Sequence, residues 1–318
     1  MGFEIIDIRR FVAQDFAPLL DAESHAWREG LRWDFTSSAR VVSTCLQEKR
    51  LSGYALVFQG KVQGYCFFFY DGEKGLIGDL FVDPSSAGLE QALRLLEHVI
   101  ETLLATPGLR RVEAQLPHFG FEQLEPCFHT SHFEGYRRRF MALSLLHGPL
   151  AHAKRGSSSL NDFLIVPWER KHDHEAAELV YDTYCNHVDT IINDQYGSLA
   201  GATRLIENII HQHGCGEYLP HLSHVALHRS SQRLAGILAV TAVLPDTAHI
   251  PQVAIARPFQ GCGLGTLLME LSFEDLARQG YQQVSLTVTD QNAGALRLYE
   301  RLGFETFRTF GAFVFNRS

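Results

Sequence analysis

Two halves of this 318-residue chain carry the same signals in the same order, and this repetition restricts the fold more than any other feature. Pairs of corresponding positions are separated by 171, 172, 174, 172 and 171 residues: Tyr54 and Val225, Gly64 and Gly236, Pro84 and Pro258, Val112 and Val284, and Phe133 and Phe304. Short apolar patterns that match by chance do not hold such a register across a domain. The repetition therefore indicates a tandem duplication.

Each half predicts a strand, two helices, three strands, a long helix, a strand, a short helix and a final strand. Successive strands favour an antiparallel meander, and the strand–helix–strand unit favours a parallel crossover. We therefore expect an α/β fold class (α+β, mixed sheet) with two tandem domains, each a mixed, mostly antiparallel sheet flanked by helices. The Gly-, Pro- and Ser-containing stretch HGPLAHAKRGSSSL separates the halves. The predicted domains are 1–147 and 161–318, joined by a linker at 148–160.

Composition limits the kinds of partner. A net charge of −8 disfavours a nucleic-acid partner, and the chain has no run of about 18 apolar residues that could span a membrane. The start MGFEIIDIRRF mixes charges with apolar residues, unlike a signal peptide. Six scattered cysteines without a C-x-x-C are typical of reduced thiols, so we expect a cytoplasmic protein. His172-x-His174 and His211-x-His213 lack a nearby Cys or acid to complete a site, and we expect no metal.

The stretch RPFQGCGLGTLLMEL, residues 257–271, has glycines at alternate positions directly before a leucine-rich helix. Without Cβ atoms an anion can approach the backbone N–H groups closely, and the helix start adds donors and a positive dipole end. The stretch therefore predicts a phosphate-binding loop. A P-loop needs Lys and then Ser or Thr after its last glycine, whereas Thr266 and Leu267 follow Gly265. A dinucleotide fingerprint beginning at Gly261 needs glycine at its sixth position, which is Thr266.

The run from Gln260 to Gly265 fits the pattern [Q/R]-x-x-G-x-[G/A] of the GCN5-related N-acetyltransferases. VAIARPFQGCGLGTLLM resembles the fourth strand, loop and third helix of that family. NAGALRLYERLGF, residues 292–304, resembles its later motif, in which Asn precedes a short helix that carries a Tyr and ends in Gly-Phe. The two signatures occur in the family's order with one strand between them. They cover residues 249–307, and the rest of the second half agrees only in its order of elements.

The resemblance implies an acyltransferase enzyme that moves an acetyl group from acetyl-CoA, without a metal, to a primary amine of a small molecule or protein by direct attack in the C-terminal domain. The diphosphate would meet the backbone amides of residues 261–266, and the pantetheine arm would pair with strand 253–255, where the family's fourth and fifth strands separate. Pro251 supports that separation, although a simple edge strand is the alternative. The expected CoA-binding residues are Val253, Ala254, Ile255, Gln260, Gly261, Cys262, Gly263, Leu264, Gly265, Thr266, Asn292 and Tyr299.

The resemblance also implies catalytic roles. Tyr299 matches the tyrosine that donates a proton to the CoA sulfur, and a phenol with a pKa near 10 suits that task; a core aromatic residue is the alternative. Asn292 caps its helix and would also touch the CoA arm or the tyrosine. His249 stands where many members carry a glutamate on the fourth strand, which makes it the candidate base, with a surface histidine as the alternative. Gln252, nearer the carbonyl, cannot act as a base.

Acceptor specificity in this family comes from the loop between the first two helices, which is CNHVDTIINDQYGSLAG, residues 185–201. Asp189 and Asp194 could hold a cationic amine, and Tyr184 and Tyr196 could form its walls. The alternative is ordinary polarity of a solvated loop.

The corresponding phosphate loop of the first half, 83–90, has one glycine in place of three, and Ser86 stands in the place of Gln260. We therefore expect a divergent, non-catalytic N-terminal domain, with weak coenzyme binding as the alternative, because helix N-terminal donors remain at 87–89. Two further functions stay open at this stage. A non-catalytic acyl-CoA-binding or sensing protein would keep the loop but lack an effective base. A transferase that uses aminoacyl-tRNA is disfavoured by the intact CoA loop and the acidic charge.

Overall fold

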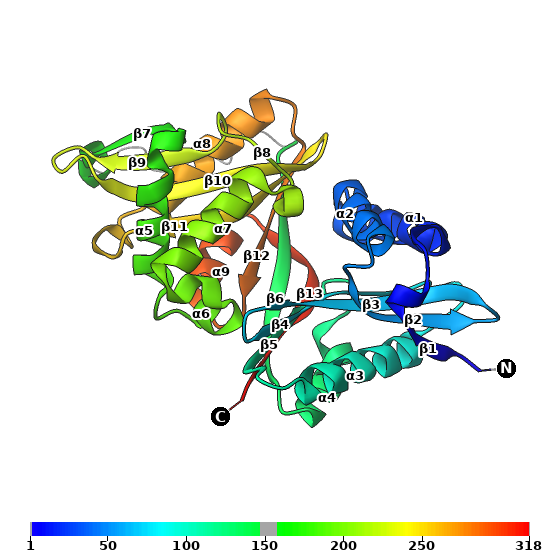
Figure 1. Cartoon of the computed structure of the whole chain (residues 1–318). Helices are drawn as coiled ribbons and strands as arrows, with labels where there is room; N and C mark the ends of the chain where they lie inside the picture. The colour runs from blue at the N-terminus through cyan, green and yellow to red at the C-terminus, as the bar shows by residue number, and fades with distance from the viewer. Residues whose placement is uncertain (1, 147–157, 318) are drawn as a thin grey trace. The chain divides into compact units, whose positions relative to one another are not determined.

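The computed structural model describes residues 2–146 and 158–317 and divides the chain into two compact units (Figure 1). Unit 1 comprises Met1–Arg138 and Arg308–Ser318, and unit 2 comprises Arg139–Phe307. Each unit combines a mixed sheet with helices on both faces, so the predicted fold class is confirmed.

Unit 1 follows the predicted order of elements. Its elements are β1 (Glu4–Asp7), α1 (Ala13–Leu31), α2 (Thr36–Gln47), β2 (Ser52–Phe58), β3 (Lys61–Asp71), β4 (Lys74–Val82), α3 (Leu89–Ala105), β5 (Arg111–Gln115), α4 (Phe121–Thr130) and the first part of β6 (Glu134–Ser144). Strands β1 to β4 pair antiparallel with their neighbours, and β4 pairs parallel with β5. Figure 1 shows α1 and α2 on one face of this sheet and α3 and α4 on the other.

Unit 2 repeats this order with small additions. Its elements are β7 (Phe163–Pro167), α5 (Asp173–Tyr184), α6 (Val188–Ile192), α7 (Leu199–His211), β8 (Glu217–Tyr218), β9 (His224–His228), β10 (Leu234–Leu244), β11 (Thr247–Ile255), α8 (Leu264–Arg278), β12 (Gln283–Thr289), α9 (Ala293–Arg301) and the start of β13 (Glu305–Asn316). The pairs β7–β9, β9–β10 and β10–β11 are antiparallel, and β11–β12 is parallel.

The sheet of unit 2 separates two apolar layers. Ala248 and Ile250 pack with Leu268 of α8 and Leu296 of α9, whereas Ile237 on the other face packs with residues of α5 and α7. Successive side chains of a strand point to opposite faces, so one strand serves both layers. The sheet is therefore buried on both sides, except where its strands separate.

The two long strands β6 and β13 each begin in one unit and end in the other. Met141, Leu143 and Leu145 at the end of β6 belong to the unit 2 core, whereas Phe313 of β13 belongs to the unit 1 core and pairs with Ala114 of β5. The compact units thus differ from the predicted ranges at these two strands. Most of the predicted linker 148–160 lies outside the described residues, so the proposed domain boundaries stay a prediction.

Helix α7 carries a glycine at a close backbone contact beside the predicted acceptor loop. A Cβ on Gly201 would meet the backbone of Gln195, with the Gln195 Cα at 2.8 Å. Gly294 also lies in the first turn of a helix. A Cβ on Gly294 would have only the Asn292 Oδ1 atom near it, at 4.0 Å. The two glycines therefore form a matched pair, of which only Gly201 holds a loop against its helix.

We predict that Gly201→Ala destabilises the chain by about 1–3 kcal/mol, because overpacking against backbone atoms forces the loop to shift. Gly294→Ala should leave the free energy of unfolding unchanged or raise it by up to about 1 kcal/mol, because alanine favours helix. Urea unfolding of the full chain measures both. Equal stabilities of the two variants would show that the contact at Gly201 is unimportant.

Candidate active site

Strands β11 and β12 pair only over their first halves. The parallel register runs from Thr247–Gln283 to Ile250–Leu286, and beyond it the described residues of β11 have no partner on β12. The register with β10 shifts over the same stretch of β11, between the Gln252 and His249 pairs, so β11 contains a bulge around Pro251. Proline has no N–H to donate to a ladder, so the strands separate at the position where Pro251 predicts that they do.

The separated part of β11 turns its backbone polar groups toward the gap between β11 and β12. The Ala256 N–H donates to the Ala235 carbonyl at 2.9 Å, which makes that pair a hydrogen-bonded one. In an antiparallel ladder bonded and non-bonded pairs alternate, so Val253, opposite Leu238, and Ile255, opposite Gly236, face away from β10. Side chains serve both carbonyls, since the Tyr184 hydroxyl donates to that of Val253 at 2.9 Å and Gln260 Nε2 to that of Ile255 at 3.0 Å.

The glycine loop leads from this edge into α8. Gly261 and Gly263 have φ values of 78° and 95°, in the left-handed region that favours glycine, and α8 begins directly after them, at Leu264. Within the described residues, the backbone N–H groups from Gly261 to Thr266 donate to no acceptor. Six neighbouring donors at a helix start, with the positive end of the helix dipole, form a site for an anion.

The third glycine of the loop has a different environment. A Cβ on Gly265 would stand 3.5 Å from a side-chain atom of Ile255 and 3.8 Å from one of Leu298, which are ordinary contacts. The chain itself therefore does not require glycine at this position.

The equivalent loop of unit 1 uses its own donors. The N–H groups of Ser85, Ser86 and Ala87 donate to Asp83, at 2.9, 3.0 and 2.9 Å, and that of Gly88 donates to Gln91 Oε1 at 3.0 Å. Unit 1 also has separating strands, because the β4–β5 register ends at Ile77–Ala114. There the Leu80 N–H donates to the Asp79 carboxylate at 2.8 Å. The loop donors that precede α3 thus have acceptors within unit 1, whereas the N–H groups of Leu89, Glu90 and Gln91 in the first turn of α3 have none among the described residues.

Helix α9 presents two of the predicted residues near the separated strands. Asn292 caps the helix, since its Oδ1 accepts from the Ala295 N–H at 3.2 Å. Tyr299 is 6% exposed and packs in the core beneath α8. Burial, followed by the negative charge of Asp189, raises the pKa of Tyr299, so the phenol keeps its proton through the neutral range.

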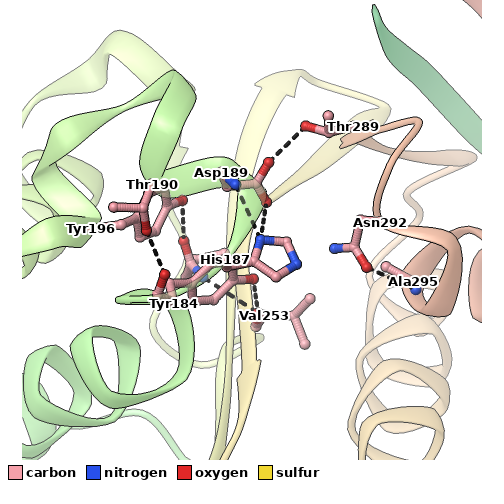
Figure 2. A network of polar contacts seen from close by, with 10 residues as sticks. Tyr184, His187, Asp189, Thr190, Tyr196, Val253, Thr289, Asn292 and Ala295 are labelled. Carbon is pink, nitrogen blue, oxygen red and sulfur yellow. Dashed lines mark hydrogen bonds and ion pairs between the residues drawn. The ribbon is translucent and has the colours of Figure 1, made fainter. Parts of the chain in front are cut away.

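The segment between α5 and α7 contacts both separated strands (Figure 2). At one end, the rings of Tyr184 and Tyr196 stack at 4.7 Å between centroids, and the Tyr196 hydroxyl donates to Gln252 Oε1 on β11 at 2.9 Å. At the other end, the Thr289 hydroxyl of β12 donates to Asp189 Oδ1 at 2.6 Å. Between these contacts lies His187, whose Nδ1 is 3.3 Å from Asp189 Oδ2. Residues 184–196 therefore span the opening between β11 and β12.

One predicted residue, His249, lies outside this cluster. His249 is 6% exposed, its Nδ1 is 2.9 Å from Ser285 Oγ, and it sits where β11 still pairs with β12. Asp194 lies in the first turn of the short 3-10 helix Asp194–Gly197. The cluster also contains His187 and Thr289, which the sequence analysis missed. The spacing His-x-Asp was visible in the sequence, but its relation to β12 was not.

The described residues contain neither a candidate metal site nor a candidate membrane-spanning helix. They contain no group of three or more His, Cys, Asp or Glu side chains that could hold a metal ion. None of the described helices is both long enough and apolar enough to cross a membrane.

Comparisons with known proteins agree with this geometry. Residues 188–304 match the model of the acetyltransferase (GNAT) family. The [ribosomal protein bS18]-alanine N-acetyltransferase of Salmonella typhimurium is 39% identical over 66 residues, which are 21% of this chain and 45% of that protein. The mycothiol acetyltransferase of Rhodococcus opacus is 42% identical over 70 residues, 22% of this chain and 23% of that protein. The chain thus spans less than half the length of these curated relatives.

Two solved structures resemble the whole chain. A GCN5-related N-acetyltransferase from Sphaerobacter thermophilus has a TM-score of 0.68 and 16% identity, covering 99% of this chain and 95% of that one. A tandem GNAT protein from the clavulanic acid biosynthesis pathway has a TM-score of 0.63 and 16% identity, covering 99% and 98%. At such identity the likeness concerns the fold. The match to the GNAT family model itself covers residues 188–304, which lie within unit 2.

Proposed function

We propose that unit 2 is an acetyl-CoA-dependent N-acetyltransferase that acts on a primary amine of a small molecule or protein by direct attack. The observation that carries the proposal is the row of six open backbone donors from Gly261 to Thr266. A diphosphate supplies the acceptors and the negative charge that these donors and the α8 dipole favour. The contribution of Cys262, Leu264 and Thr266 to the proposed site is their backbone N–H groups.

The separated edge of β11 supports the same substrate. The pantetheine arm of CoA is an extended chain with amide groups, and the backbone N–H groups of Val253 and Ile255, which face away from β10, suit the carbonyls of such a partner. Ala254 lies between them and bonds to β10. The Val253 N–H is the donor that we assign to the thioester oxygen, where it would stabilise negative charge as the amine attacks.

Tyr299 supplies the acid in this proposal. Burial keeps the phenol protonated, and its hydroxyl is the proton donor that we assign to the departing thiolate. Asp189, Asp194 and Tyr196 line the acceptor side, on the segment that spans the opening. The bS18-alanine enzyme acts on a protein amino group, and the mycothiol enzyme gives a small-molecule precedent. Both classes of amine belong in the acceptor test.

We expect Gly263→Glu to abolish acetyl-CoA binding, because it places bulk and negative charge at the open donors. Gly280→Glu is the matched control: Gly280 has a φ of 89°, lies in open space and follows the other end of α8. The two variants share the same backbone strain, so their difference isolates the phosphate site. Calorimetry with acetyl-CoA measures both. Retained binding in Gly263→Glu would refute the phosphate loop.

We also expect one acetyl-CoA per chain, because unit 1 uses the loop donors that precede α3 internally, whereas unit 2 leaves all six of its donors open. The same titration gives the stoichiometry. Gly263→Glu should then show no remaining site. A ratio of two, or one site left in Gly263→Glu, would mean that unit 1 binds the coenzyme.

Tyr299→Phe should lower turnover by about 100-fold or more and leave the Kd for acetyl-CoA within about twofold, because it removes an acid and keeps the packing. Tyr281→Phe, after the end of α8, is the control and should retain wild-type turnover. Release of CoA is followed with an alanine-terminated peptide, glucosamine and a lysine peptide as acceptors. Tight coenzyme binding without turnover on any amine would favour a non-catalytic acyl-CoA-binding protein.

A further inference from the structure

The first turn of α6 fixes the orientation of one imidazole at the opening between β11 and β12. His187 is the N-cap of α6, and its Nδ1 accepts from the Asp189 backbone N–H at 3.2 Å. The ring also meets the Tyr184 ring edge-on, at 5.2 Å between centroids. The segment that carries these contacts bonds to β11 through Tyr184 and to β12 through Asp189. The chain therefore holds the His187 ring in one orientation.

The capping bond determines which ring nitrogen of His187 carries the proton. A backbone N–H always donates, so Nδ1 of the neutral imidazole is the acceptor and Nε2 carries the hydrogen. Within the described residues, Nε2 has no hydrogen-bond partner. The side chain of His187 is 29% exposed, so a small molecule can reach this donor.

A second side-chain donor faces the same space. Figure 2 shows Nε2 of His187 on the side of the ring that is turned away from Asp189 and toward Asn292. The Oδ1 atom of Asn292 accepts from the Ala295 N–H at 3.2 Å, so the Nδ2 group is the part of that amide that remains to donate. Both side chains thus offer hydrogens to the space between them. A group that accepts from them has to come from a bound molecule.

We infer that His187 determines acceptor specificity, because its Nε2–H binds an oxygen on the carbon next to the one that carries the acceptor amine. This inference rests on the proposed function of unit 2, with the Asp189 carboxylate holding the amine as a cation. Asp189 Oδ2 lies 3.3 Å from Nδ1 of the same ring, so the anion and the Nε2–H donor are little more than one imidazole ring apart. An acceptor that meets both groups needs its nitrogen and its oxygen close together.

The acceptor class that fits these two groups has nitrogen and oxygen on neighbouring carbon atoms. It comprises α-amino carbonyl compounds, such as the N-terminus of a peptide, and amino alcohols, such as glucosamine. The side-chain amine of lysine has no such oxygen and lies outside the class. A carboxylate attracts an ammonium group whatever else the amine carries, whereas a neutral N–H distinguishes an oxygen from a methyl group. His187 and not Asp189 would therefore decide between amines of the same shape.

Two pairs of amines with matching shapes test the assignment. Glycinamide and isobutylamine share one heavy-atom skeleton, as do ethanolamine and propylamine, and only the first amine of each pair has the oxygen. We expect His187→Ser to lower the ratio of kcat/KM values within each pair by about tenfold. Serine is also a good N-cap, so the start of α6 is kept. Comparing this ratio between wild type and variant cancels the intrinsic reactivity of the amines.

Two further variants separate recognition of the oxygen from a structural role. Asp189→Asn keeps the backbone N–H that bonds to His187 and removes the charge that holds every amine, so all four kcat/KM values should fall and both ratios should stay unchanged. His174 is an exposed histidine in the first turn of α5, and His174→Ser should change neither the rates nor the ratios. Equal losses within each pair in His187→Ser would overturn the inference.

A measurement without turnover tests the donor itself. Nitrogen NMR of the histidine rings, assigned with the His187→Ser spectrum, should show a neutral His187 that carries its proton on Nε2. With CoA present, glycinamide should shift this Nε2 signal more than isobutylamine does. Equal shifts, or a proton on Nδ1, would refute the donor. Failure of the wild-type chain to bind acetyl-CoA would instead refute the proposed function, so the two failures are distinguishable.

Discussion

The end of pairing between β11 and β12 at Ile250 is the constraint on which the rest of unit 2 depends. A sheet interior ordinarily satisfies every backbone group, so a strand that loses its partner must find other ones. Side chains from α5 and from the glycine loop serve the Val253 and Ile255 carbonyls. The N–H groups of the same two residues remain directed at the gap. The separation thus creates donors that a ligand can use, and it does so without any charged side chain.

The two units differ in which of their backbone N–H donors find acceptors within the chain. Both have a parallel pair that ends early, at Ile77–Ala114 in unit 1 and at Ile250–Leu286 in unit 2. In unit 1 the carboxylate of Asp79 accepts from the next N–H, and it is buried beside Glu23, whose pKa is raised by burial and then by Asp79. Asp83 and Gln91 take the donors of the loop. The repeated fold therefore keeps its strands and helices, while acceptors within unit 1 take the loop donors that precede α3.

The sequence allowed the order of elements, the helix after the glycine loop and the Asn292 cap to be predicted, because each depends on neighbours along the chain. Glycines with positive φ, capping side chains and apolar periods are local signals. The partners of residues 184–196 are not local, since Tyr184 bonds to a residue 69 positions away and Asp189 to one 100 positions away. No pattern within CNHVDT identifies those partners. The bulge around Pro251 also breaks the alternation by which His249 could have been placed relative to Val253.

The acceptor segment and the thioester donor are parts of one connected structure. Tyr184 holds the Val253 carbonyl, and Val253 also offers the N–H assigned to the thioester oxygen. His187 lies three residues after Tyr184 and contacts Asp189, and Asp189 accepts a hydrogen bond from Thr289. A shift of β12 relative to β11 would therefore move the acceptor segment and the assigned thioester donor apart. Placing both on short connections between the same two strands fixes their separation more firmly than two independent loops could, and alignment of this kind contributes strongly to the rate of a two-substrate reaction.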